Sequence, residues 1–169
     1  MTNFLNLAKS RYSVRKFADK AIPQEVMAQV LEAARIAPTG ANAQPQRIKV
    51  ATSAEDLTKI DACTPCRFGA PAVLLVCYDK TVCWRRKFDG KSCGVSDACI
   101  VTTHLMLQAQ DLGLGTCWVM HFDPAKATEL FNLPENIVPV AMLPIGYIAE
   151  DAEPSPMHSQ RYALEDILI

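Results

Sequence analysis

The chain has 169 residues, half of them hydrophobic, and a formal net charge of −1. The near-neutral charge argues against general affinity for nucleic acid, because neutralising phosphates needs a clustered cationic surface. No uninterrupted apolar run approaches the roughly 18 residues needed to cross a bilayer, so no membrane partner is expected. The length suits a single domain over residues 1–169, and a small molecule is the expected partner.

The cysteines predict a reducing compartment. There are seven, an odd number: Cys63, Cys66, Cys77, Cys83, Cys93, Cys99 and Cys117. Asn3, Asn6 and Lys9 interrupt the stretch in which a secretory signal would be apolar. Free thiols and a cytoplasmic location are therefore expected.

The first half of the chain predicts one helix and two strands. Apolar residues recur at helical spacing after Pro23 until Pro38 ends the pattern, which indicates a helix between them. RIKVAT at residues 47–52 alternates apolar and polar positions, as a half-buried strand does. AVLLVCY at residues 72–78 is apolar throughout, which favours a central strand.

The second half predicts a long helix over residues 92–112, whose apolar surface is wider than one face and so indicates burial or contact with a second subunit. LGTCWV at residues 114–119 indicates a strand. A short helix follows, with Asp123 as its cap and Pro124 in its first turn. Residues 136–148 predict another buried strand, which Pro139 and Pro144 make imperfect. This alternation indicates an α+β layered fold.

The segment RYSVRKF, residues 11–17, is a candidate phosphate site. Arg11, Ser13 and Arg15 occupy alternate positions, so an extended chain points all three the same way. Guanidinium groups bind phosphate oxygens bidentately, and a serine hydroxyl can donate a further hydrogen bond. On its own, the segment is more typical of a solvated basic turn.

The segment APTGANAQP, residues 37–45, is a candidate contact for a heterocycle. Thr39, Asn42 and Gln44 stand among small residues that let the backbone approach a ligand closely. The two amides can donate and accept, which suits the mixed edge of an isoalloxazine ring. By itself the segment also fits an ordinary turn.

Taken together and in this order, the two segments resemble the nitroreductase family of flavin enzymes. The shared pattern is a basic, serine-containing stretch followed about 25 residues later by a Pro, small residue, Asn, Gln, Pro loop. Here the loop stands as Pro38, Thr39, Asn42, Gln44 and Pro45. The resemblance continues through residues 112–119 and 138–147 to the C-terminal part, and so spans nearly the whole chain.

The resemblance implies a nitroreductase-like α+β fold, with a central mixed β-sheet flanked by helices, in an intertwined homodimer with two FMN sites at the subunit interface. Arg11 and Ser13 would hold the phosphate and ribityl end of FMN, and Arg15 would face the N1 and O2 side of its ring. Pro38, Thr39 and Asn42 would contact the flavin from the partner chain, and Arg161 would close on the phosphate. The full expected cofactor-binding set is Arg11, Tyr12, Ser13, Arg15, Pro38, Thr39, Gly40, Asn42, Gln44, Met120 and Arg161.

By the same resemblance the protein is an FMN-dependent oxidoreductase. Hydride would pass from NADH or NADPH through FMN to a small acceptor such as a nitro compound or quinone, by a ping-pong mechanism. Because the cofactor carries the chemistry, neither a catalytic side chain nor a metal ligand is expected. The chain departs from the family pattern at Gln46, Met120, His121 and Ser159. Other acceptor reactions, such as dehalogenation, azo reduction or ring dehydrogenation, remain open, because the fold does not fix the acceptor.

An alternative from a different class is a flavin-free protein that uses its cysteines for redox chemistry or metal binding. Cys63 and Cys66 form a CTPC pair. A dithiol pair is expected to open a helix after a strand, but this pair precedes Arg67 and a Gly-Ala-Pro run. A zinc site would need two more ligands, and Cys83 and Cys93 repeat no CxxC spacing. Incidental thiols are the favoured interpretation.

The remaining polar residues have ordinary interpretations. His104 is expected to be hydrogen-bonded in a core or interface, His158 to be solvated, and His121 to lie near the rim of the flavin site. The run from Trp84 to Lys87 is too short for a nucleic-acid contact and is interpreted as a surface or dimer-contact segment.

Overall fold

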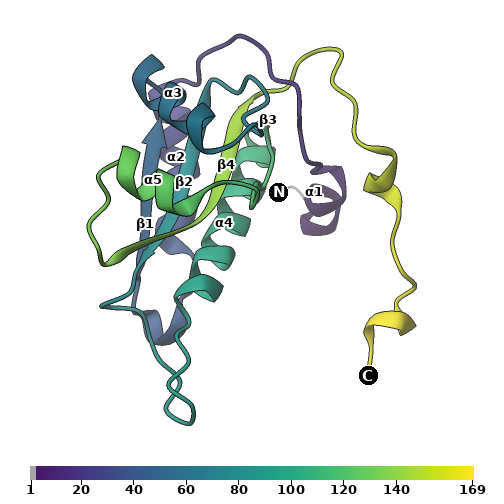
Figure 1. The fold of residues 1–169 in the computed structure, drawn as a ribbon. Coiled ribbons are helices and arrows are strands. Elements are labelled where there is room, and N and C mark those ends of the chain that lie inside the picture. The colour runs from purple at the N-terminus through teal and green to yellow at the C-terminus, as the bar shows by residue number, and fades with distance from the viewer. Residues whose placement is uncertain (1–2) are drawn as a thin grey trace.

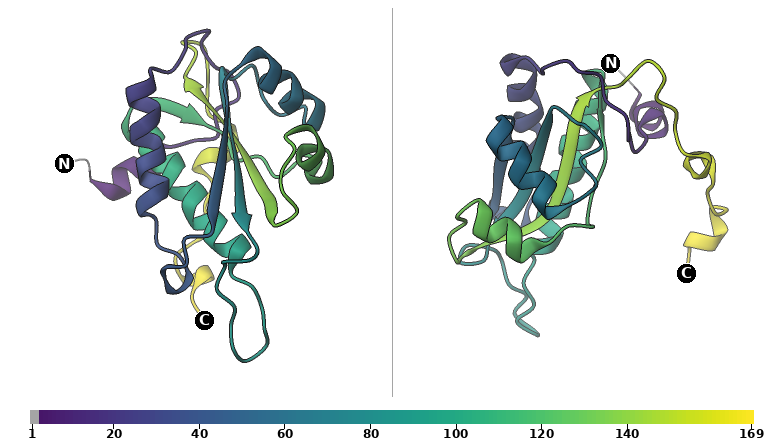
Figure 2. Two further views of the ribbon diagram at one scale, coloured as in Figure 1. Left: turned by 90° about the vertical axis from the view of Figure 1, so that its left-hand side faces the viewer. Right: turned by 45° about the horizontal axis from the view of Figure 1, so that its top comes forward.

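The structure, a computed structural model, describes residues 3–169 and places a four-stranded sheet between two layers of helices (Figures 1 and 2). The helices are α1 (Phe4–Ser10), α2 (Gln24–Ile36), α3 (Ala54–Cys63), α4 (Gly94–Asp111) and α5 (Pro124–Leu130). The strands are β1 (Gln46–Ala51), β2 (Ala72–Asp79), β3 (Leu114–Thr116) and β4 (Ile137–Tyr147). The α+β class and the predicted elements are confirmed within a few residues. The exception is β3, which is shorter than predicted, and α3 was not predicted.

The sheet has the order β1-β2-β4-β3, and its three pairings are antiparallel. The sheet that was expected to be mixed is therefore antiparallel in its named strands. A parallel contribution comes from an isolated bridge between Ser13 and Thr116, which attaches the N-terminal segment to the end of β3. Strand β2 is central, as its apolar sequence predicted.

The two helical layers explain why β2 is apolar on both faces. Alternate residues of a strand point to opposite faces. Leu74 and Val76 pack with Val30 of α2 and Leu105 of α4. The residues between them, such as Leu75, pack on the other face, where α3 and α5 lie. In the left view of Figure 2, the two layers lie on either side of the sheet.

Two short helices begin at side-chain caps. Ser53 Oγ accepts a hydrogen bond from the Asp56 amide at 3.1 Å before α3. Asp123 Oδ1 accepts one from the Lys126 amide at 3.0 Å before α5, with Pro124 in the first turn as predicted. Such caps satisfy amides that have no partner within the helix.

Strand β4 runs through both of its prolines. Its register with β2 shifts between Val76 and Cys77, where Cys77 is opposite Pro139. The sequence expectation of an imperfect strand is confirmed as a local irregularity rather than a break. Along this strand, β2 and β3 pair on opposite sides, so β4 connects the centre of the sheet to the edge where the N-terminal segment attaches.

The C-terminal segment after β4 lies apart from the sheet (Figure 1). Its last ten residues, 160–169, are exposed, among them Leu164, Ile167 and Leu168. In residues 3–169 the structure has no helix of the length and apolar character that a membrane crossing requires.

Gly115→Ala is expected to lower the free energy of unfolding by about 1–3 kcal/mol, because overpacking a buried site forces its neighbours apart. A Cβ at Gly115 would lie 2.6 Å from Val14 Cγ2 and 2.8 Å from Ile148 Cγ1. Urea denaturation measures the loss. Gly90→Ala is the control, since its φ of +70° introduces backbone strain of about 1 kcal/mol with no atom within 4 Å. An unchanged unfolding free energy in Gly115→Ala would contradict the close packing.

Candidate functional site

The N-terminal segment reaches the sheet in an extended conformation after α1 ends. The Val14 amide donates to the Thr116 carbonyl at 2.9 Å, and the Ala18 amide donates to the Tyr147 carbonyl at 2.9 Å. The Val14 side chain is fully buried. Its neighbours Ser13 and Arg15 therefore face the opposite way, as the alternate spacing predicted.

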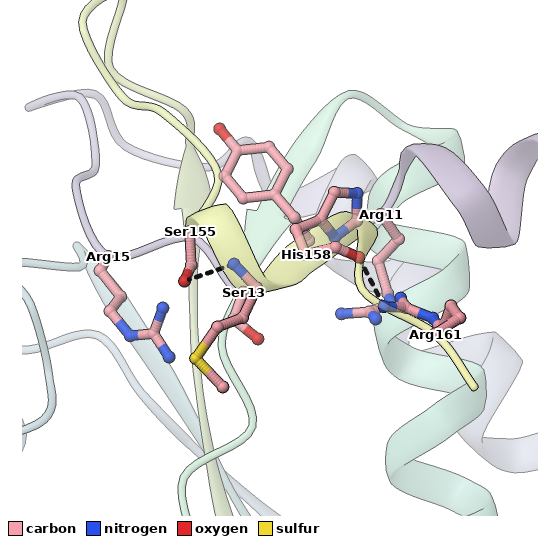
Figure 3. A pocket seen from close by; sticks show the side chains of 8 residues that line it. Arg11, Ser13, Arg15, Ser155, His158 and Arg161 are labelled. Carbon is pink, nitrogen blue, oxygen red and sulfur yellow. Dashed lines mark hydrogen bonds between the residues drawn. The ribbon is translucent and has the colours of Figure 1, made fainter.

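These residues line a pocket of about 220 Å³. One wall comes from the N-terminal segment and the other from the C-terminal tail: Arg11, Tyr12, Ser13, Arg15, Ser155, Met157, His158 and Arg161. Figure 3 shows Arg15 on one side of the pocket and Arg11 and Arg161 on the other. In the described part of the chain, none of the lining residues is acidic. The pocket is thus a concentrated positive site with hydroxyl donors, which suits a doubly charged phosphate.

The tail is attached to the N-terminal segment by His158. Its Nε2 atom lies 3.1 Å from the Lys9 carbonyl oxygen, and its ring meets the ring of Tyr12 edge-on at 6.0 Å between centroids. His158 is half-buried, so the expectation that it is solvated was wrong. Lys16 and Asp151 form an ion pair that joins the same two segments.

Arg161 is oriented by backbone carbonyls of the tail. Its Nη1 atom donates to the carbonyls of His158 and Gln160, each at 2.6 Å. The Met157 amide donates to Ser155 Oγ at 3.3 Å, and this hydrogen bond shapes the turn that precedes Arg161 (Figure 3). The tail thus presents a guanidinium group and a hydroxyl to the arginines of the first wall.

A buried thiol lies beside this pocket. Burial raises the pKa of the Cys117 thiol, while Arg15, Ser13 and Arg11 act in the opposite direction. Because burial is the larger effect, Cys117 stays protonated at neutral pH and is a packing group rather than a nucleophile.

The loop at Thr39–Gln44 lies outside the pocket, although the sequence assigns it to the same cofactor. Its backbone forms a 3-10 turn at Gly40–Asn42, and the backbone amide of Gln44 donates to Thr39 Oγ1 at 3.1 Å. Met120 is 60% exposed and also lies outside the pocket. The structure therefore brings together Arg11, Tyr12, Ser13, Arg15 and Arg161, and leaves Pro38, Thr39, Gly40, Asn42, Gln44 and Met120 outside this pocket of the single chain.

The residues that sequence reasoning missed are Ser155, Met157 and His158, all in the tail. The prolines around Ser155 marked a turn, but no local pattern indicates where the tail goes after it.

The Cys63 and Cys66 pair lies at the C-terminal end of a helix. Cys63 is the last residue of α3 and Cys66 lies in the turn that follows, so the pair closes a helix instead of opening one. Within residues 3–169, no three or more His, Cys, Asp or Glu side chains are grouped so that they could hold a metal ion. His104 is hydrogen-bonded as expected, with Nδ1 2.9 Å from the Ile100 carbonyl oxygen, and His121 is exposed.

Known proteins are similar to this chain in fold and in sequence. Residues 8–64 and 65–147 match the sequence profile of the Nitroreductase family. A protein of Methanothermobacter thermautotrophicus, provisionally named NADH dehydrogenase/NAD(P)H nitroreductase, is 30% identical over 94% of this chain and 87% of its own length. The FMN reductase (NAD(P)H) of Bacillus subtilis is 27% identical over 92% of this chain and 73% of its own. The crystal structure of a nitroreductase family protein from Clostridium difficile 630 has a TM-score of 0.93 and 42% identity, covering 99% of this chain and 98% of that one. The chain belongs to the Nitroreductase family.

Phosphate is expected to raise the melting temperature of the protein more than chloride does at equal ionic strength. A ligand at ten times its dissociation constant stabilises the folded state by about 1.4 kcal/mol. Arg161→Ala removes one guanidinium from the pocket and is expected to reduce this stabilisation. Arg35→Ala, an exposed arginine of α2 paired with Glu32, is the matched control and is expected to keep it. Equal phosphate effects in the two variants would show that the pocket is not the anion site.

Proposed function

We propose that the protein is an FMN-dependent oxidoreductase that transfers hydride equivalents from NADH or NADPH to a small acceptor, such as a nitro compound or quinone, by a ping-pong mechanism. The observation that carries the proposal is the pocket in which Arg11, Ser13, Arg15 and Arg161 converge. The FMN and NAD(P)H in the names of its relatives support it. Residues 1–169 would form one FMN-binding domain in the cytoplasm, where the seven free cysteines suit a reducing environment.

The donors in the pocket fit the phosphate end of FMN. A phosphomonoester carries close to two negative charges at neutral pH, and three guanidinium groups line this site. Ser13 offers a hydroxyl between Arg11 and Arg15 along the chain. Arg11, Ser13 and Arg161 would hold the phosphate, with His158 and Tyr12 keeping the two walls together.

The pocket in one chain is too small for the whole cofactor. Its volume of about 220 Å³ is below the ~300–1,000 Å³ of pockets that enclose small ligands. The remainder of the site would come from a second copy of the chain, through the Pro38–Gln44 segment. A homodimer with FMN at the subunit interface therefore completes the site.

Exposed apolar surface supports the same dimer. Phe4 of α1 is 64% exposed and Ile36 of α2 is 64% exposed, and with Leu107 of α4 they line a groove of about 580 Å³. The tail also exposes Leu168 and Ile169. Contiguous apolar surface of this kind marks an interaction site, and a two-fold dimer would cover it on both chains.

When bound, FMN supplies the hydride and electron transfer between the nicotinamide and the acceptor. The chain's own part is to bind, orient and tune. Arg15 would fix a positive charge near the ring, which favours the negatively charged reduced state. Asn42 and Gln44 would position the ring edge through their amides. No side chain is assigned as a general acid or base.

The purified protein is expected to be yellow, or to become yellow with added FMN, and NADH or NADPH is expected to bleach the flavin absorbance. Turnover with nitro compounds, quinones and azo dyes then compares acceptors. A colourless protein that binds no added FMN would overturn the proposal.

Arg15→Ala is expected to lower the reduction potential of the bound flavin by tens of millivolts, since about 1.4 kcal/mol corresponds to about 30 mV for a two-electron couple. Anaerobic titration against redox dyes measures the change. Arg35→Ala, with its exposed guanidinium on α2, is the control. An unaltered potential in Arg15→Ala would rule out the assigned role of this residue.

A further inference from the structure

The Thr39–Gln44 loop holds a backbone conformation that Ala41 and Gln44 do not favour. The φ angle is 50° at Ala41, 55° at Asn42 and 50° at Gln44. This left-handed region is uncommon for residues with a side chain. Such strain persists where the surrounding structure holds a segment in place, and it gathers at ligand sites. The loop therefore depends on contacts that restrain it.

Asp97 of α4 supplies one such contact from a distant part of the chain. The Gly40 amide donates to Asp97 Oδ1 at 2.9 Å, across 57 residues of sequence. In the part of the chain that the structure describes, the other hydrogen bonds of the loop join residues at most five positions apart. Asp97 is thus the hydrogen-bonded connection between this loop and the helical layer.

The segment that precedes α4 also packs closely on the loop. A Cβ at Gly40 would lie 3.2 Å from Trp84 Cβ and 3.6 Å from Cys93 Cβ. The first contact is tighter than an ordinary van der Waals approach, so the backbone at Gly40 fits closely against the segment that leads into α4. Hydrogen bonding and packing therefore fix the same residue.

The Asp97 carboxylate is itself held in a costly position. The residue is 2% exposed, and within residues 3–169 its Oδ2 atom has no hydrogen-bond partner. Burying an incompletely paired carboxylate is unfavourable. Its place in the first turn of α4 offsets part of this cost, because a helix N-terminus favours negative charge. A buried polar group of this kind requires an explanation.

We infer that Asp97 is a positioning residue for the cofactor: by holding the Gly40 amide, it keeps the Thr39–Gln44 loop in the conformation in which Asn42 and Gln44 contact the flavin ring. This inference rests on the proposed function. The loop is then ordered before FMN binds, so the entropy lost in ordering it does not weaken FMN binding.

The test compares Asp97→Ala with Asp97→Asn by FMN titration, using the change in flavin fluorescence and absorbance. Asp97→Ala is expected to weaken FMN binding about tenfold, the effect of losing one hydrogen bond to a charged group. Asp97→Asn keeps an oxygen that can accept from Gly40, so its affinity and flavin spectrum are expected to stay close to those of the wild type. Asp123→Ala is the control, because it removes the cap of α5 and destabilises the fold away from the loop. Its FMN affinity is expected to remain unchanged.

Hydrogen exchange of the Gly40 amide tests the inference in the wild type as well as in the variant. In the FMN-free wild type this amide is expected to be protected, and Asp97→Ala is expected to expose it. Fast exchange in the wild type would overturn the inference even if Asp97→Ala fails to fold. So would wild-type FMN affinity in a folded Asp97→Ala. A wild type that binds no FMN would instead contradict the proposed function, while Gly40 exchange still reports whether Asp97 holds the loop.

Discussion

The packing of Val14 against Gly115 determines where the charged groups of the pocket point. Val14 is fully buried, and a Cβ at Gly115 would overlap its side chain. Because side chains alternate along an extended segment, Ser13 and Arg15 must then face outward. A slip of one residue would bury an arginine or a hydroxyl and expose the valine. The same contact therefore stabilises the core and orients the anion-binding groups, and the tail adds its wall to a surface that is already fixed.

Much of the fold could be predicted because its signals are local. Strand β2 is apolar over its whole length, and α5 carries its own cap at Asp123. Helix α3 was missed because only Ile60 and Cys63 of its residues are buried, although Ser53 followed by acidic residues was a usable start signal. Strand β3 ends earlier than predicted. The backbone amide of Cys117 donates to the Pro144 carbonyl, but Pro144 has no N–H group that could donate a hydrogen bond in return.

The site was predictable only where its signals are local in the sequence. Alternate spacing identified Arg11, Ser13 and Arg15, whereas Arg161 came from the family resemblance. Ser155, Met157 and His158 could not be found, because the path of the tail depends on contacts such as that of His158 with Lys9, 149 residues away. The Thr39–Gln44 loop lies outside the pocket, and the sequence of one chain does not show which surfaces a second chain would bring together.

The two-walled pocket also has a consequence for biosynthesis. Its first wall ends at Arg15 and its second at Arg161, so the ribosome must translate nearly the whole chain between them. At about 5–20 residues per second, this interval is on the order of ten seconds. A nascent chain would offer an anion only half of its ligands throughout that time. Stable capture of a phosphate-bearing ligand would therefore follow synthesis, and a polypeptide released before Arg161 would lack one of the three guanidinium groups of the pocket.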